Sequence, residues 1–161
     1  MNRLIEGQPF PPLALPTAGG GSVKLPGDLA GSASVILVYR GSWCPYCSAQ
    51  LASFARAYDR LTHAGVRVVA LSADSRSDAE STVAEHKLPF PVAYGIDPHE
   101  LAELIGNYVG TDLPHHYAQS TNVLLDDQGR VLVAVYSTGA IGRLAPADIV
   151  GYLAHLREDE A

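Results

Sequence analysis

The chain has 161 residues, of which 47% are hydrophobic and 17% are charged, and its formal net charge is −6. This length predicts a single domain over residues 1–161, able to bury about two-thirds of its unfolded surface. The acidic balance, without a cluster of Lys or Arg, argues against nucleic acid or an anionic membrane surface as the main partner. The first ten residues lack the apolar core of a signal peptide and no stretch is apolar enough to span a bilayer, so a cytoplasmic location is expected.

Glycine and proline dominate the first 33 residues, in which Ser22–Leu25 alternates briefly and predicts a short edge strand. Residues 34–39 form the first strong strand candidate, almost wholly apolar, as a strand buried on both faces should be. A helix is expected over 45–64, with Pro45 at its first position and Gly65 as its left-handed stop. One face of this helix carries apolar residues at spacings of four and three, namely Cys47, Leu51, Phe54, Tyr58 and Leu61.

The rest of the chain alternates strand-like and helix-like segments. The expected strands are 66–71, 92–94, 122–125 and 131–136, the last two joined by a turn over 126–129. The expected helices are 78–87, one that begins at Pro98 with Asp97 as its N-cap, and one that begins at Pro146; residues 109–119 read as irregular. Strand-helix-strand order implies parallel strands and the late hairpin adds an antiparallel edge, so the fold class is α/β with a mixed sheet flanked by helices.

The two cysteines stand together in the run Trp43-Cys44-Pro45-Tyr46-Cys47, where the first strong strand leads into the helix. Unsatisfied backbone N–H groups at a helix N-terminus favour a thiolate. Cys47 lies on the helix face that packs against the sheet, so we expect Cys44 to be the exposed, attacking sulfur and Cys47 to be the shielded sulfur that closes the disulfide. A bridge between them would close a tiny loop and add little stability, which favours redox or metal chemistry over a structural role.

Two alternatives to redox chemistry stay open. A zinc site would need four ligands, and His115 and His116 are the only adjacent histidine pair. Adjacent histidines in an extended loop usually point apart, so we interpret them first as loop residues. The cysteines could also be inert, because a free thiol packs as a small hydrophobic group. A metal-binding or interaction module without turnover is therefore the rival from a different class.

The run Tyr39–Cys47 on a strand-to-helix turn resembles the thioredoxin superfamily, and more closely the peroxiredoxin-like branch of the alkyl hydroperoxide reductase and thiol-specific antioxidant family. Segments 7–15, 88–92 and 123–131 resemble other parts of that family. The resemblance implies a thioredoxin-like fold and a thiol-disulfide oxidoreductase with an antioxidant role, or a thiol-dependent peroxidase with Cys44 as the peroxidatic cysteine. It implies no cofactor, a disulfide or peroxide substrate, and an external thiol reductant that is thioredoxin-like or of low molecular weight.

Arg40 precedes Cys44 by four residues, and a fixed positive charge there would stabilise the thiolate. The resemblance favours this role, although an ordinary surface arginine fits the sequence equally well. Arg143 matches an arginine of the same branch and is a possible supporting residue. The candidates for substrate contact are the neighbours of the cysteines, of which Trp43 also shields the sulfur: Ser42, Trp43, Pro45 and Tyr46.

Several positions depart from the pattern of typical peroxiredoxins. Gly41 stands where that family has Thr, Leu37 where it has Pro, and Ser120, a second possible supporting residue, where it has an Arg that would activate a peroxide. Thioredoxins place a cis-proline near that same point, and this chain has no proline between Pro114 and Pro146. These departures weigh against both classical peroxidase activation and the usual thioredoxin groove.

Overall fold

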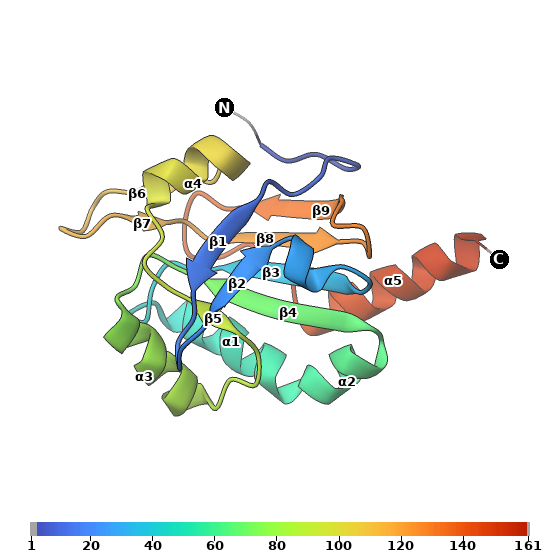
Figure 1. The fold of residues 1–161 in the computed structure, drawn as a ribbon, viewed down its shortest axis with the longest axis horizontal. Coiled ribbons are helices and arrows are strands. Elements are labelled where there is room, and N and C mark those ends of the chain that lie inside the picture. The colour runs from blue at the N-terminus through green and yellow to red at the C-terminus, as the bar shows by residue number, and fades with distance from the viewer. Residues whose placement is uncertain (1–2, 161) are drawn as a thin grey trace.

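A computed structural model describes residues 3–160 and places a five-stranded mixed sheet at the centre of the chain (Figure 1). Met1, Asn2 and Ala161 lie outside the described residues, so the first part of the segment considered for a signal peptide is not covered. In spatial order, the strands are β5 (Val92–Ala93), β4 (Val66–Leu71), β3 (Ala33–Val38), β8 (Thr121–Leu125) and β9 (Val131–Tyr136). β3 runs parallel to β4 and antiparallel to β8, which confirms the mixed sheet.

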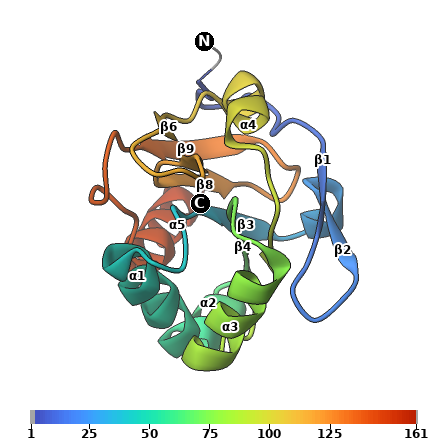
Figure 2. The same ribbon diagram turned by 90° about the vertical axis from the view of Figure 1, so that its left-hand side faces the viewer.

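Helices cover both faces of this sheet, as the two views of the ribbon show (Figures 1 and 2). One face carries α1 (Pro45–Arg56), α2 (Tyr58–His63), α3 (Arg76–His86) and α5 (Pro146–Glu160). The other face carries α4 (Pro98–Ile105), the paired strands β1 (Leu13–Pro16) and β2 (Ser22–Leu25), and the short turn η1 (Gly27–Leu29). Among the described residues, no helix combines the length and the apolar composition that crossing a membrane requires.

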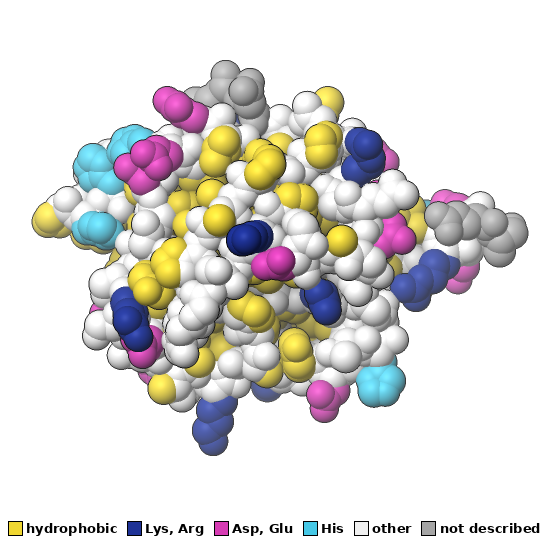
Figure 3. All heavy atoms as spheres, viewed as in Figure 1, with side chains coloured by type: hydrophobic (Ala, Val, Ile, Leu, Met, Phe, Trp, Pro, Cys, Tyr) yellow, Lys and Arg dark blue, Asp and Glu magenta, His cyan; other side chains and the backbone are white. Residues whose placement is uncertain are grey.

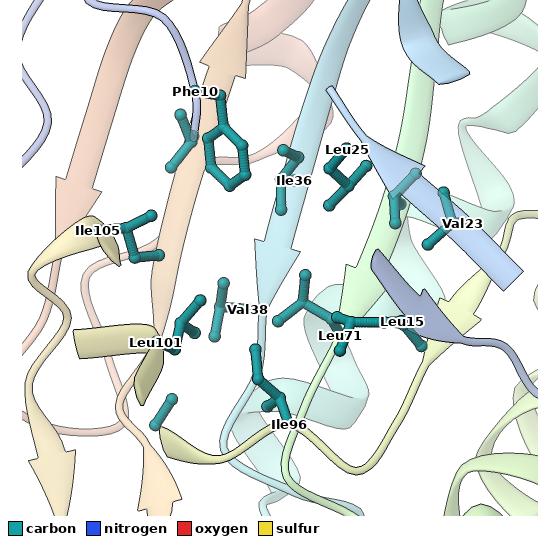
Figure 4. Close-up of a cluster of buried hydrophobic side chains, with 14 of the residues drawn as sticks. Phe10, Leu15, Val23, Leu25, Ile36, Val38, Leu71, Ile96, Leu101 and Ile105 are labelled. Atoms are coloured by element: carbon teal, nitrogen blue, oxygen red, sulfur yellow. The ribbon is translucent and has the colours of Figure 1, made fainter. Parts of the chain in front are cut away.

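The central strand β3 supplies side chains to two separate cores, one on each face of the sheet. Ile36 and Val38 point into the cluster beneath α4 and the β1–β2 pair, which Figure 4 shows. Val35 and Leu37 point into the cluster beneath α1. Successive side chains of a strand alternate between its faces, so a strand covered on both sides must be apolar throughout. This double burial fixes the end of β3 and the start of α1 relative to each other.

The structure differs from the sequence-based expectations at several boundaries. The helix expected over 45–64 is divided at Ala57, whose φ of −92° and ψ of 5° bend the chain so that α2 keeps Leu61 in the same buried cluster as Phe54. α3 begins two residues earlier than expected, because the hydroxyl of Ser75 accepts the Asp78 N–H and caps it. Residues 109–119, expected to be irregular, contain the short antiparallel strands β6 (Val109–Gly110) and β7 (Tyr117–Ala118).

Phe54 anchors α1 to the sheet, and it is completely buried there. We expect Phe54→Ala to lower the free energy of unfolding by about 3–4 kcal/mol, since it removes an aromatic ring from a packed core and leaves a cavity. Urea denaturation measures this loss. Arg56→Ala, an exposed change at the end of the same helix, is the control and should cost no more than about 0.5 kcal/mol. Equal losses in the two variants would contradict the packing that holds α1 in place.

Candidate active site

Cys44 is the N-cap residue of α1, and Pro45 occupies the first helical position, as the sequence predicts. The backbone of Cys44 is extended, with φ of −89° and ψ of 113°, and its Sγ accepts the backbone N–H of Cys47 at 3.4 Å. A cysteine at this position takes the place of the usual Ser, Thr or Asp cap, and the positive end of the helix dipole favours its thiolate. Both cysteines are free thiols in this structure.

The expected exposure of Cys44 is wrong, because both cysteines are 0% exposed. The covering groups come from outside α1. The guanidinium of Arg40 lies 3.6 Å from the Cys44 sulfur, and that of Arg143 lies 3.9 Å from it. Reasoning from one face of the helix could not include these side chains. Burial therefore does not distinguish the attacking cysteine from the resolving one. The electrostatic surroundings of the two sulfurs do.

The surroundings give the two thiols opposite acidities. Burial alone would raise the pKa of Cys44, but hydrogen bonds from Cys47 and Arg40 outweigh burial and bring this pKa below its ordinary value. Burial and the hydrogen bond with Cys44 raise the pKa of Cys47 to about 11, although Arg143 opposes the rise. The Cys47 sulfur also accepts the backbone N–H of Arg40 at 3.3 Å. The surroundings therefore favour a negative charge on Cys44 over one on Cys47.

Arg40 is fixed by contacts on three sides, unlike an ordinary surface arginine. Its Nε donates to Gln119 Oε1 at 3.0 Å and its Nη2 to the hydroxyl of Tyr117 at 3.1 Å, while Nη1 faces the Cys44 sulfur. The Tyr117 hydroxyl donates in turn to Asp112 Oδ1 at 2.6 Å. These partners, in and around β7, pre-orient the guanidinium so that its charge points at one sulfur.

Arg143 approaches the cysteines from the opposite direction, from the loop that follows β9. Its Nη2 lies 3.0 Å from the Cys47 sulfur. Its Nη1 donates to the buried side chain of Gln50 in α1 at 2.7 Å, and its Nε donates to the carbonyl of Ala140 at 2.8 Å. Gln50 Nε2 then donates to Asn122 Oδ1 in β8 at 3.0 Å. The two arginines are therefore held by separate polar networks, and Arg143 lies closer to Cys47 than to Cys44.

The other site residues proposed from the sequence differ in exposure and in their contacts. Trp43 and Tyr46 are 46% and 54% exposed beside the buried cysteines, so both can contact a substrate. The indole of Trp43 packs edge-on against the ring of Tyr117, with 4.8 Å between ring centroids. Ser42 is tied through its backbone N–H, which donates to Asp74 Oδ2 at 2.9 Å. Ser120 is completely buried, and among the described residues its hydroxyl has no hydrogen-bond partner, so it forms no hydrogen bond with either thiol.

The histidines considered for zinc have hydrogen-bond partners other than the cysteines. His115 Nε2 is 2.8 Å from the carbonyl oxygen of Ala73, and His116 Nδ1 is 3.0 Å from His99 Nε2. Histidine side chains gather on the surface over α4 and the β6–β7 pair in Figure 3. Within residues 3–160, no three His, Cys, Asp or Glu side chains are grouped so that they could hold a metal ion.

A cleft of about 850 Å³ opens beside the turn that precedes Cys44. Arg40, Trp43, Asp74, His115 and Tyr117 are among the residues that line it. Sequence reasoning missed Asp74, although it lies three residues beyond the end of β4, the parallel neighbour of β3, and so emerges at the same edge of the sheet as the cysteine turn. It also missed Tyr117, for which the segment 109–119 carries no periodic signal.

Asp74 makes stability depend on pH in a specific direction. Burial raises the pKa of Asp74 from its ordinary 3.8 to about 6, so folding favours its protonated form. Stability from this group is fully present below pH 4 and is lost as pH rises through 6, by up to about 3 kcal/mol. We expect the stability of Asp74→Asn minus that of the unaltered protein, measured by urea denaturation, to grow by about 2 kcal/mol from pH 4 to pH 7. A difference that does not change with pH would contradict this assignment.

Comparison with known proteins places this site in a family. The AhpC/TSA family model matches residues 6–134. The thiol-disulfide oxidoreductase ResA of Bacillus cereus is 32% identical over 127 residues, which are 78% of this chain and 64% of ResA. The matched region thus spans less than two-thirds of that relative. Peroxiredoxin 2 of Sulfurisphaera tokodaii is 28% identical over 148 residues, covering 85% of this chain and 66% of that protein.

Solved structures share the fold at lower identity. Peroxiredoxin 6 of Arenicola marina has a TM-score of 0.82 at 18% identity, over 96% of this chain and 74% of that chain. Peroxidoxin BcpB of Mycobacterium tuberculosis has a TM-score of 0.79 at 19% identity, over 97% and 98% of the two chains. These likenesses confirm the thioredoxin-like fold. Because the family model covers most of the 161 residues, the chain belongs to the AhpC/TSA family.

Proposed function

We propose that the protein is a thiol-disulfide oxidoreductase that cycles Cys44 and Cys47 between dithiol and disulfide. The observation that carries this proposal is the opposite acidity of two hydrogen-bonded thiols in one helical turn. Cys44 has a lowered pKa at the start of α1, whereas the pKa of Cys47 is raised to about 11. A nucleophile and a resolving thiol need this difference, because the first must be ionised at rest and the second must stay protonated until the first has reacted.

The reaction consists of two exchange steps. The Cys44 thiolate attacks one sulfur of a substrate disulfide, forms a mixed disulfide and releases the other substrate sulfur as a thiolate. Cys47 then loses its proton and attacks Cys44, which releases the second substrate thiol and leaves a disulfide between Cys44 and Cys47. The substrate disulfide gains two electrons, and the two cysteines lose them. An external thiol, thioredoxin-like or of low molecular weight, returns the pair to the dithiol by the reverse exchange.

The two arginines act on different steps of this cycle. Arg40 faces Cys44 and holds the charge of the attacking thiolate. Arg143 lies 3.0 Å from Cys47 and lowers the pKa of that thiol against the effect of burial. Its guanidinium therefore stabilises the Cys47 thiolate in the resolving step. Gln50 and Ala140 hold Arg143 in place, so its charge is in position before Cys47 ionises.

The burial of Cys44 requires a local movement before a bulky disulfide can reach it. Arg143 lies on a segment between β9 and α5 that has no regular secondary structure, and Trp43 is half exposed at the rim of the cleft. Displacement of Arg143, which lies 3.9 Å from the Cys44 sulfur, is the movement that we expect to uncover it. Trp43, Tyr46, Ser42 and Pro45 surround the cysteines in the turn and the first turn of α1, and they are the residues that we expect to contact the substrate.

Reduction of a peroxide is the second candidate, and one observation favours it. The Cys44 sulfur lies between two guanidinium groups, at 3.6 Å from Arg40 and 3.9 Å from Arg143, so a small oxidant would meet two positive charges there. Cys44 would attack one peroxide oxygen and become a sulfenic acid while water or an alcohol leaves; Cys47 would then form the disulfide and release water. Arg143 would supply the charge that Ser120 cannot. A cytoplasmic location and an antioxidant role stay predictions in either case.

We expect Cys44→Ser to abolish reduction of a model disulfide. Cys47→Ser should still attack but should accumulate mixed disulfides, because the resolving sulfur is missing. Mass spectrometry of Cys47→Ser after incubation with cell extract and with oxidised glutathione measures the adducts. Cys44→Ser, treated identically, is the matched control and should stay free of adducts. Capture of the partner by Cys47 in the Cys44→Ser variant, with none in Cys47→Ser, would reverse the proposed roles.

Arg40→Met and Arg143→Met separate the two steps, since methionine keeps an apolar stem and removes the charge. Arg40→Met should raise the pKa of Cys44 and slow formation of the mixed disulfide at pH 7 by about tenfold, the effect of one pKa unit. Arg143→Met should leave that step within about threefold and slow release of the second thiol by about tenfold. Stopped-flow measurement of both steps tests this. If Arg143→Met slowed only the first step, its assignment to Cys47 would be wrong.

A further inference from the structure

Asp74 is a buried carboxylate that the proposed cycle does not use. It lies three residues beyond the end of β4 and is 6% exposed, in the wall of the cleft that Trp43 also lines. Two hydrogen bonds hold the backbone of Asp74 in place: its N–H donates to Ser72 Oγ at 3.1 Å, and its carbonyl accepts the N–H of Gly95 at 2.9 Å. From there its Oδ2 reaches across to the backbone N–H of Ser42 at 2.9 Å. The hydrogen bond joins the segment after β4 to the turn that leads into Cys44.

The turn that Asp74 holds is tightly packed and ends at the reacting sulfur. The N–H of Cys44 donates to the carbonyl of Gly41 at 3.1 Å. The Trp43 indole lies so close to Gly41 that a Cβ at that glycine would be 2.3 Å from Trp43 Nε1. A shift of the Ser42 amide would therefore move Trp43 and the N-cap together. The contacts of Cys44 with the Cys47 N–H and with Arg40 depend on that N-cap geometry.

Stabilisation of the fold does not explain why an aspartate occupies position 74. Its raised pKa means that folding disfavours the ionised form present at neutral pH. The groups around Asp74 shift its pKa in both directions. Asp78 in α3 raises this pKa further, whereas the Ser42 N–H, His115 before β7 and the Ser72 hydroxyl lower it. Tyr39, just after β3, also interacts with the Asp74 charge. A charged acceptor makes a shorter and stronger hydrogen bond than a neutral one, which suits a group that must fix a backbone amide.

We propose that Asp74 is a positioning residue for the thiol chemistry: its carboxylate fixes the Gly41–Trp43 turn and thereby holds Cys44 at the start of α1, facing the Cys47 amide and Arg40. This inference rests on the proposed function only in taking Cys44 as the reacting sulfur. It concerns the ionisation of that sulfur, which can be measured without any turnover.

Geometry and charge make opposite predictions for the loss of Asp74. Removing a nearby negative charge would by itself favour the Cys44 thiolate and lower its pKa. Releasing the turn would weaken the hydrogen bonds to the thiolate and raise its pKa. Asp78 provides the matched control, because it lines the same cleft and carries the same charge but is exposed, in the first turn of α3.

The experiment measures the rate of Cys44 alkylation by iodoacetamide against pH in the full-length protein, with mass spectrometry to assign the modified cysteine. We expect Asp74→Ala to slow alkylation at pH 7 by about tenfold, equivalent to a rise of one unit in the pKa of Cys44. Asp74→Asn, whose amide oxygen can still accept the Ser42 N–H, should stay within about threefold of the unaltered protein. Asp78→Ala should leave the rate unchanged or raise it slightly. Faster or unchanged alkylation in Asp74→Ala would overturn the proposal.

A second measurement does not depend on how Asp74→Ala folds. In the unaltered, reduced protein, the amide proton of Ser42 should shift in NMR spectra with a midpoint near the Asp74 pKa of about 6. The same signal should not titrate in Asp74→Asn. A Ser42 amide proton whose chemical shift does not change as Asp74 ionises would overturn the proposal. If both tests give the expected results but the protein exchanges no disulfides, the proposed function is wrong and the positioning role of Asp74 still holds.

Discussion

The start of α1 is the point on which the chemistry of this protein depends. Cys44 replaces the usual oxygen cap, so its sulfur accepts the Cys47 N–H that an N-cap side chain would normally accept. Burial works against a charge at this place, and the hydrogen bonds from Cys47 and Arg40 reverse its effect. At Cys47, one helical turn further into the core, burial and the hydrogen bond with Cys44 outweigh the opposing effects of Arg143 and the Arg40 N–H, so the pKa of this thiol is raised. A difference of position within one turn thus assigns different chemistry to two identical side chains.

The polar groups around the thiols come from elements far apart in the sequence, and the sheet brings them together. Arg40 lies two residues beyond the end of β3, Asp74 lies beyond the end of β4, and Asn122 lies in β8. Because β3 is buried on both faces by two separate cores, its end has little freedom to move. The arginine networks can therefore stay pre-oriented, which limits the reorganisation needed when charge moves from one sulfur to the other.

Local sequence signals predicted the parts of this architecture that depend on local physics. The apolar run of β3, Pro45 at the helix start and the position of Cys44 beside it follow from periodicity and capping. The covering of Cys44 could not be predicted, because Arg143 reaches it from 99 residues away and is held by Gln50. Tyr117 was missed for a similar reason: its two-residue strand is defined by pairing with β6 and by contacts with Arg40 and Trp43. Polar contacts between residues far apart in the chain produce no periodic pattern in the sequence, so a single sequence does not predict them.

The acidity of the two thiols is the central claim, and their separate titration tests it most directly. Alkylation of the reduced, unaltered protein across pH 5 to 11, with mass spectrometry reading each cysteine, gives both values from one sample. Our account predicts that Cys44 ionises first, at a pKa below its ordinary value, and that Cys47 ionises near pH 11. Ionisation of Cys47 before Cys44, or an ordinary pKa for both thiols, would contradict it.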